Sequence, residues 1–170
     1  MIPINIPLPS FDQLDNIIEL PITWQIPTII LLTIIFKRKI VYKAFTIYIV
    51  TGLLIIPVFH QGGSLGYLLT ANFGYLLGIY PLIKIIDKLN KKNRISIINF
   101  LRYGFLAISV MHLSGICYNF IQTLFYDKFN LFFFNVGKYS LGKIGYHLFM
   151  LIPLVLFIKP IRYLRFKLND

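Results

Sequence analysis

Five apolar runs, set apart by short polar or basic segments, constrain this chain more than any other feature. Long apolar runs with few charges are typical of helices that cross a bilayer. Hydrophobic residues make up 57% of the 170 residues and charged residues 14%, a composition typical of membrane proteins. We therefore predict an all-α fold, a polytopic transmembrane helical bundle in one integral membrane domain over residues 1–170. The predicted spans cover about residues 24–36, 44–59, 73–86, 95–118 and 144–158.

The basic residues predict the orientation of these spans. The net charge is +11, but the basic residues are divided among the segments between the runs, which argues against nucleic-acid binding. Residues 1–23 and the connection between the second and third runs contain no lysine or arginine. By the positive-inside rule we expect these two segments outside, and the C-terminus in the cytoplasm, of a bacterial-type plasma membrane. The segments expected inside carry Lys37, Arg38, Lys39 and Lys43; Lys84, Lys88, Lys91, Lys92 and Arg94; and Lys159, Arg162, Arg165 and Lys167.

A glycine-rich connection lies between the second and third runs, with Gly62, Gly63 and Gly66 close together. Glycine tolerates positive φ and close approach of the backbone, and non-helical backbone near a membrane must be buried in protein or line a cavity. This pattern predicts an ordered cap over a small-molecule pocket. A simple tight turn, with Tyr67 and Tyr75 as aromatic anchors at the interface, fits about equally well.

Four residues with polar groups stand out in or beside the apolar runs. Gln25 opens the first span with an amide that can donate and accept hydrogen bonds, although it could also satisfy backbone near Pro21 and Pro27. His112 lies inside the fourth run, where ionisable groups face the bundle interior or a cavity; a structural histidine bonded to a neighbouring helix is at least as good an interpretation. Lys143 and Tyr146, three residues apart, would share one helix face. Lys143 could meet a carboxylate or extend outward to the membrane surface.

The N-terminal segment and the single cysteine show no sign of a signal peptide or a disulfide. Residues 1–20 lack the basic and apolar regions of a signal peptide, and Ser10 is expected to cap a short helix that ends at Leu20. Cys117 has no second cysteine to pair with and is expected to be buried and inert. The chain has no phosphate-binding loop, HExxH or GxSxG motif. We therefore expect no enzyme activity, cofactor or metal, since His60 and His112 have no obvious catalytic partner.

Four motifs follow one another over about residues 20–80. They are Pro21-Ile22-Thr23-Trp24-Gln25, Gly52 to Pro57-Val58-Phe59, Gly62-Gly63-Ser64-Leu65-Gly66-Tyr67-Leu68-Leu69, and Gly74-Tyr75-Leu76-Leu77-Gly78. Their order and spacing resemble the BioY family, the biotin-binding, substrate-specific (S) components of energy-coupling-factor (ECF) vitamin transporters. The likeness is good over this region and looser beyond it.

The resemblance implies a helical bundle that binds biotin from outside, under the cap. It would deliver biotin inward together with a transmembrane coupling subunit and cytoplasmic ATPases. Lys143 and Tyr146 stand where the family usually has an Asp and then a Lys, and Ala71-Asn72 replaces a usual Pro-Thr. The substrate-binding residues that the resemblance and the polar positions indicate are Gln25, Phe59, Gly63, Tyr67, Asn72, Gly74, Tyr75, His112, Lys143 and Tyr146.

The N-terminus departs from the family, which typically has six spans. Either the sequence begins downstream of a first helix, or residues 1–20 replace that helix with an interfacial one. Two other functions stay open at this point: a binding subunit for a different vitamin or metabolite, for which Lys143 and Tyr146 speak, and a membrane accessory protein without transport activity.

Overall fold

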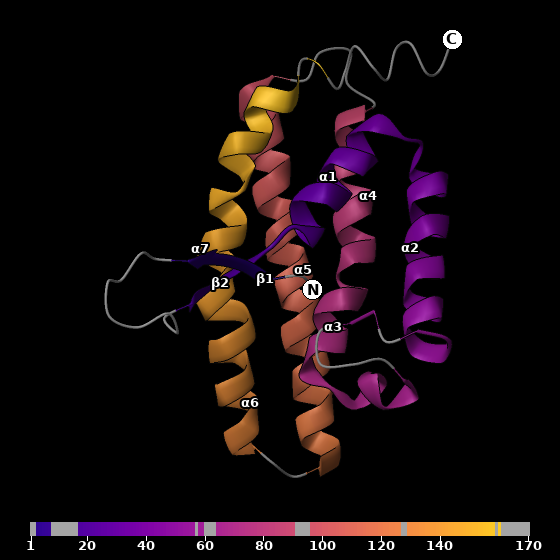
Figure 1. Cartoon of the computed structure of the whole chain (residues 1–170), viewed down its shortest axis with the longest axis vertical. Coiled ribbons are helices and arrows are strands. Elements are labelled where there is room, and N and C mark those ends of the chain that lie inside the picture. Colours follow the sequence, from indigo (N-terminus) through magenta and orange to yellow (C-terminus); the bar gives the residue numbers. More distant parts are fainter. Residues whose placement is uncertain are drawn as a thin grey trace.

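The bundle consists of long helical rods packed side by side, with one short helix lying obliquely between them (Figure 1). The structure is a computed structural model that describes residues 3–7, 17–56, 58–59, 64–90, 96–126, 129–158 and 160. Its strands are β1 (Pro3–Pro7) and β2 (Ile17–Thr23). Its helices are α1 (Gln25–Ile35), α2 (Arg38–Leu54), the 3-10 turn η1 (Leu65–Leu69), α3 (Ala71–Leu77), α4 (Ile79–Asn90), α5 (Ile97–Tyr126), α6 (Phe129–Val136), the π-helical turn η2 (Gly137–Leu141) and α7 (Gly142–Phe149).

Helix lengths support the predicted membrane bundle. Two helical stretches, Ile97–Phe125 and Phe129–Ile158, are long and apolar enough to cross a bilayer. Only Gly78 separates α3 from α4, so these two helices together extend about 30 Å at the usual rise of 1.5 Å per residue. The first helix covers most of the predicted span 24–36, but its 11 residues extend only about 16 Å. The fourth and fifth predicted spans were too short, since α5 continues to Tyr126 and the last helical stretch already begins at Phe129.

The ends of the rods alternate between the two ends of the bundle. The α1–α2 connection, the end of α4, the start of α5 and the end of the last helical stretch lie at one end, whereas η1, the end of α5 and the start of α6 lie at the other (Figure 1). The basic segments beside Lys37 and Lys88 therefore meet at one end. There Arg38 forms an ion pair with Asp87 at 3.6 Å, and the Asn90 side chain donates a hydrogen bond to the Thr33 carbonyl at 2.7 Å. These contacts join α1, α2 and α4.

The described part of the N-terminal segment forms two paired β-strands. The prediction of a helix that ends at Leu20 is therefore wrong for residues 17–20, which belong to β2. Strands β1 and β2 pair antiparallel, with Ile4 opposite Leu20 and Ile6 opposite Ile18. Isoleucines that alternate with polar residues favour a strand, and Pro21 disfavours helical backbone just before it. Ser10 lies outside the described residues. Strand β2 leads directly into α1 and packs against α7.

Close packing of α3 against α5 depends on glycines. A Cβ at Gly78 would lie 2.6 Å from the Met111 carbonyl oxygen, and one at Gly115 would overlap the ring of Tyr75. Small residues allow helix backbones to approach closely in membranes. This contact brings Tyr75 on α3 beside His112 on α5, with their ring centroids 5.7 Å apart.

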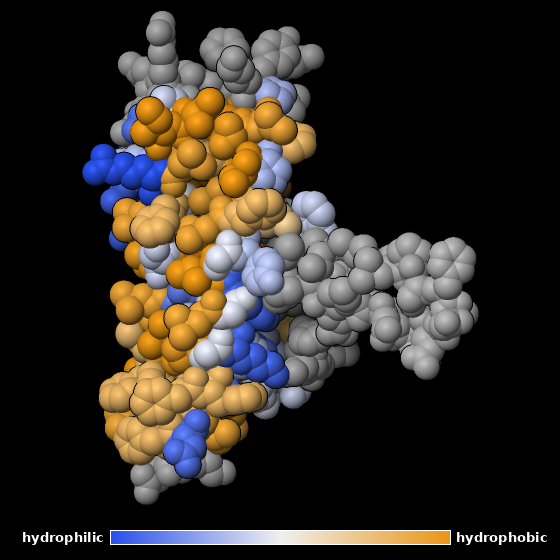
Figure 2. All heavy atoms as spheres, turned by 90° about the vertical axis from the view of Figure 1, so that its left-hand side faces the viewer, coloured by the Kyte–Doolittle hydropathy of each residue, from blue (hydrophilic) through white to orange (hydrophobic). Residues whose placement is uncertain are grey.

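Apolar side chains cover most of the outer face formed by α6 and α7, as Figure 2 shows from that side. Large exposed side chains there include Phe133, Leu141 and Leu156, which suits contact with lipid chains. Cys117 is also exposed on α5, contrary to the expectation that it is buried. The buried positions around it are Gly115 and Asn119, so Cys117 lies on the opposite, outer side of α5.

Candidate functional site

A small cavity with a mostly apolar surface lies inside the bundle where α1, α3, α4, α5 and the η2–α7 segment meet. Four of the residues predicted from sequence line it: Gln25, Asn72, Tyr75 and Lys143. Its volume of about 20 Å³ is enough for about one water molecule. The other residues of its wall are Ile26, Leu76, Ile79, Met111, Tyr139 and His147.

Two histidines and a serine form a buried chain of hydrogen bonds beside this cavity. Nδ1 of His112 lies 2.9 Å from Oγ of Ser140, and Nε2 of His112 lies 2.9 Å from Nδ1 of His147. His112 and His147 are 2% and 4% exposed, so this contact joins α5 to α7 away from water. The interpretation of His112 as a histidine bonded to a neighbouring helix is confirmed.

Three buried polar atoms close to this chain make no hydrogen bond of normal geometry within the described part of the protein. They are the Tyr75 hydroxyl, Oδ1 of Asn119 and Nε2 of His147. The Tyr75 hydroxyl lies near Ser140 and Asn119. Tyr75 and His147 belong to the cavity wall, and an unpaired buried polar group costs about 1–3 kcal/mol. Two residues of the cavity wall therefore each carry a buried polar atom to which a ligand could hydrogen-bond once the cavity enlarges.

Lys143 supplies the positive charge at the cavity. It is half-buried, and its ammonium lies 5.4 Å from the ring centroid of Tyr139, a cation–π distance. Tyr146 does not share this face: it is 41% exposed and lies outside the cavity wall, so the pair Lys143 and Tyr146 is not brought together there. The π-helical turn η2 precedes α7 and places buried Ser140 three residues before Lys143.

The cap residues named from sequence lie apart from the cavity. Phe59 and Tyr67 are buried and stack with ring centroids 4.4 Å apart. Gly74 packs against Tyr118, whose hydroxyl donates a hydrogen bond to the Leu68 carbonyl. None of these three predicted residues lines the cavity, and Gly63 lies outside the described residues. The described cap is therefore a tightly packed aromatic cluster.

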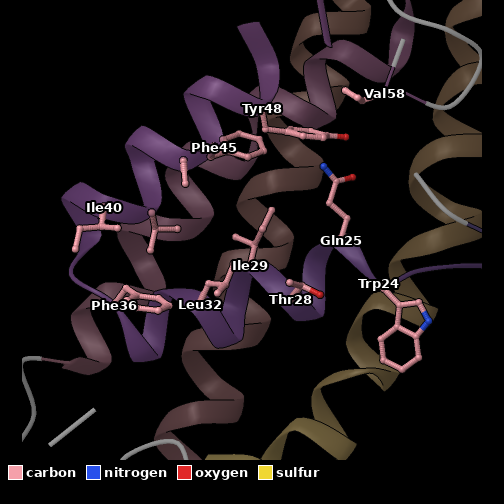
Figure 3. A pocket seen from close by; sticks show the side chains of 12 residues that line it. Trp24, Gln25, Thr28, Ile29, Leu32, Phe36, Ile40, Phe45, Tyr48 and Val58 are labelled. Carbon is pink, nitrogen blue, oxygen red and sulfur yellow. The ribbon is translucent and has the colours of Figure 1, made fainter. Parts of the chain in front are cut away.

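A much larger apolar groove lies on the other side of α1, between α1 and α2. Its volume is about 640 Å³, within the range of small-molecule sites. Figure 3 shows Gln25 and Tyr48 toward one end and Phe36 and Ile40 toward the other. Gln25 lines both the groove and the cavity. Trp24, Thr28, Ile29, Leu32, Val41, Ala44, Phe45 and Val58 complete the lining of the groove.

The prediction from sequence missed His147 and Tyr139. His147 carries the same signal as His112, an ionisable group within an apolar run, and it lies one helical turn after Lys143. Tyr139 gave no such signal, because an aromatic residue near a span end is usually an interface anchor. Its position depends on the π-helical turn, which spacing along a regular α-helix does not anticipate. Within the described residues, no three His, Cys, Asp or Glu side chains gather as a metal site would require.

Comparison with known proteins gives one match. The BioY family model matches residues 4–154, nearly the whole chain. Neither the curated proteins nor the solved structures gave a match. The family match extends from β1 to the last helical stretch and includes every residue that lines the cavity. The chain therefore belongs to the BioY family, helical membrane proteins of biotin and vitamin transport.

Proposed function

We propose that this chain is the substrate-binding membrane subunit of a biotin uptake transporter. The observation that carries the proposal is the meeting of one cation, Lys143, with the neutral hydrogen-bonding groups of Gln25, Asn72 and Tyr75 around one cavity. Biotin matches these residues. Its carboxylate could pair with Lys143, and its uncharged ring system can donate hydrogen bonds to, and accept them from, the neutral side chains. A carboxylate paired with an ammonium gives one of the stronger kinds of hydrogen bond.

Binding must enlarge the cavity, because about 20 Å³ is far below the 300–1,000 Å³ typical of small-molecule sites. The N-terminal turn of α1 is the wall element with space behind it, since Gln25 also borders the 640 Å³ groove. Movement of this turn toward α2 would open the cavity. Such a step lets the protein enclose biotin in the closed form and admit it in the open form.

The direction of transport follows from the basic end of the bundle. The end that carries Lys37, Arg38 and Lys88 faces the cytoplasm under the positive-inside rule, so biotin enters from the side of η1. The described residues include no nucleotide-binding motif, and delivery inward would be driven by a transmembrane coupling subunit and cytoplasmic ATPases, as the family resemblance implies. The C-terminus then lies in the cytoplasm of a bacterial-type cell.

Isothermal titration of the detergent-purified chain tests this function. We expect saturable binding of biotin and of desthiobiotin, which keeps both the carboxylate and the urea group. Riboflavin, which has no carboxylate, should give no binding heat. A folded sample that binds none of them would contradict biotin as the substrate. Binding of another small carboxylate by that sample would instead support a subunit for a different metabolite.

A further inference from the structure

The hydrogen-bond chain of Ser140, His112 and His147 ends at a buried atom without a partner among the described residues, on a residue that lines the cavity. His147 is 4% exposed and lines the cavity, and its Nε2 makes no hydrogen bond to any described residue. The two hydrogen bonds within the chain, between Ser140 and His112 and between His112 and His147, are both 2.9 Å long. A buried polar atom without a partner is costly, so its position suggests that a ligand bonds it.

The chain can present this atom as either an acceptor or a donor. A neutral imidazole has one protonated and one bare nitrogen. If His147 carries its proton on Nδ1, it donates to Nε2 of His112; His112 then donates from Nδ1 to Ser140, and Nε2 of His147 is an acceptor. If Ser140 donates to Nδ1 of His112, then Nε2 of His112 donates to His147, and Nε2 of His147 is a donor.

Both arrangements keep the two internal hydrogen bonds and the same heavy-atom positions. Only protons and the rotation of the Ser140 hydroxyl differ between them. Lys143, in contrast, can only donate. His147 therefore complements Lys143 at the cavity wall, because it can adapt to an uncharged ligand group that places N–H donors next to a carbonyl acceptor.

We propose that His147 is a ligand-contacting residue that hydrogen-bonds through Nε2 to an uncharged urea-type or amide-type group of the substrate, and that His112 and Ser140 are positioning residues that set its orientation and tautomer. The inference rests on the proposed function, under which this group is the urea of biotin. Under this proposal, uncharged histidine and serine side chains recognise the uncharged part of the substrate, whereas Lys143 binds its carboxylate.

Titration of four purified variants with biotin tests the contact. His147→Leu should weaken binding roughly tenfold to a hundredfold, because the urea group is then buried without its partner. His147→Gln keeps a polar group near the position of Nε2 and should bind within about fivefold of the wild type. Tyr146→Phe, the exposed neighbour, is the matched control and should bind unchanged. Ser140→Ala should weaken binding less than His147→Leu does.

Nitrogen-15 NMR of histidine-labelled protein separates contact from a structural role. The chain has three histidines, so single variants assign the ring signals. Biotin should shift the Nε2 signal of His147, and Ser140→Ala should change the tautomer signals of His147 even without biotin. If the wild type binds biotin while His147→Leu binds equally well or the Nε2 signal stays fixed, the contact is disproved. If the wild type does not bind biotin, the proposed function fails, and this contact fails with it.

Discussion

The ring of Tyr75 occupies the space in which a Cβ of Gly115 would lie. Tyr75 borders the cavity from α3, and Gly115 lies on α5 three residues after His112, so this contact holds the two sides of the site at a fixed spacing. The fit is close enough that even a single methyl group on α5 must displace the aromatic ring or separate the helices.

Gly115→Ala should therefore destabilise the protein despite the better helix propensity of alanine. Overpacking in a filled interior typically costs about 1–3 kcal/mol, more than the roughly 1 kcal/mol that alanine gains over glycine in a helix. Thermal unfolding in detergent should show a lower midpoint, and biotin affinity should fall as Tyr75 moves. Gly145→Ala is the matched control, because a Cβ there has no atom within 4 Å; an equal loss in this variant would refute the packing argument.

Lys143→Met should weaken biotin binding roughly tenfold to a hundredfold, since a hydrogen bond to a charged group contributes about 1.5–3 kcal/mol. Lys138→Met is the matched control: Lys138 also lies over the Tyr139 ring, at 5.4 Å, but is exposed and outside the cavity wall. Titration with biotin amide, which lacks the carboxylate, gives the second comparison. Lys143→Met should not weaken the binding of biotin amide. An equal loss of affinity for biotin and for the amide would mean that Lys143 contacts the rings of biotin and not its carboxylate.

Phe59→Ala should lower the stability of the cap by about 3–5 kcal/mol, the usual cost of removing a buried aromatic side chain. The Phe59 ring stacks on Tyr67, contacts Tyr48 edge to face with centroids 5.5 Å apart, and fills the space beside Gly52. Protease cleavage and thermal unfolding would measure the loss. Leu69→Ala removes a side chain that is 65% exposed and should have a small effect; similar losses in both variants would mean that the aromatic cluster does not hold the cap.

Tyr67 predicts a pH dependence of stability in the alkaline range. Burial raises the pKa of Tyr67 to about 12, with smaller contributions from Tyr48 and Tyr139. The unfolded chain, with its pKa near 10, loses this proton first, so the contribution of Tyr67 is complete below pH 10 and decreases as the pH rises from 10 toward 12. The difference in melting temperature between wild type and Tyr67→Phe should stay constant from pH 7 to 9.5 and change above it. A difference that changes near neutral pH would contradict this assignment.

Much of the fold follows from the pattern of the sequence. The apolar runs and basic connections predicted a helical membrane bundle, because burial of apolar side chains and placement of charges dominate in a bilayer. The N-terminal hairpin was missed although Ile4-Asn5-Ile6 and Ile17-Ile18 show strand-forming residues. The residues near Ser10 are typical of a helix N-cap, whereas the nearby prolines favour extended backbone.

The site could be predicted in part. Gln25, Asn72, Tyr75 and Lys143 do line one cavity, because a polar side chain in an apolar run must find an interior partner. Tyr146 lies outside the cavity wall although it is three residues after Lys143 on the same helix. Tyr139 was missed because its position depends on the π-helical turn. The cap was expected to cover the pocket, but its described residues pack their rings against each other. Such long-range aromatic packing leaves no periodic signal in the sequence.

Helix α1 separates two spaces of very unequal size, the cavity of about 20 Å³ and the apolar groove of about 640 Å³. Gln25 borders both spaces. A shift of the first turn of α1 toward α2 would therefore enlarge the cavity and reduce the volume of the groove. Lipid or detergent chains that fill the groove would oppose this shift of α1. The surrounding acyl chains would then compete mechanically with the substrate, and biotin affinity should vary with how tightly those chains fill the groove.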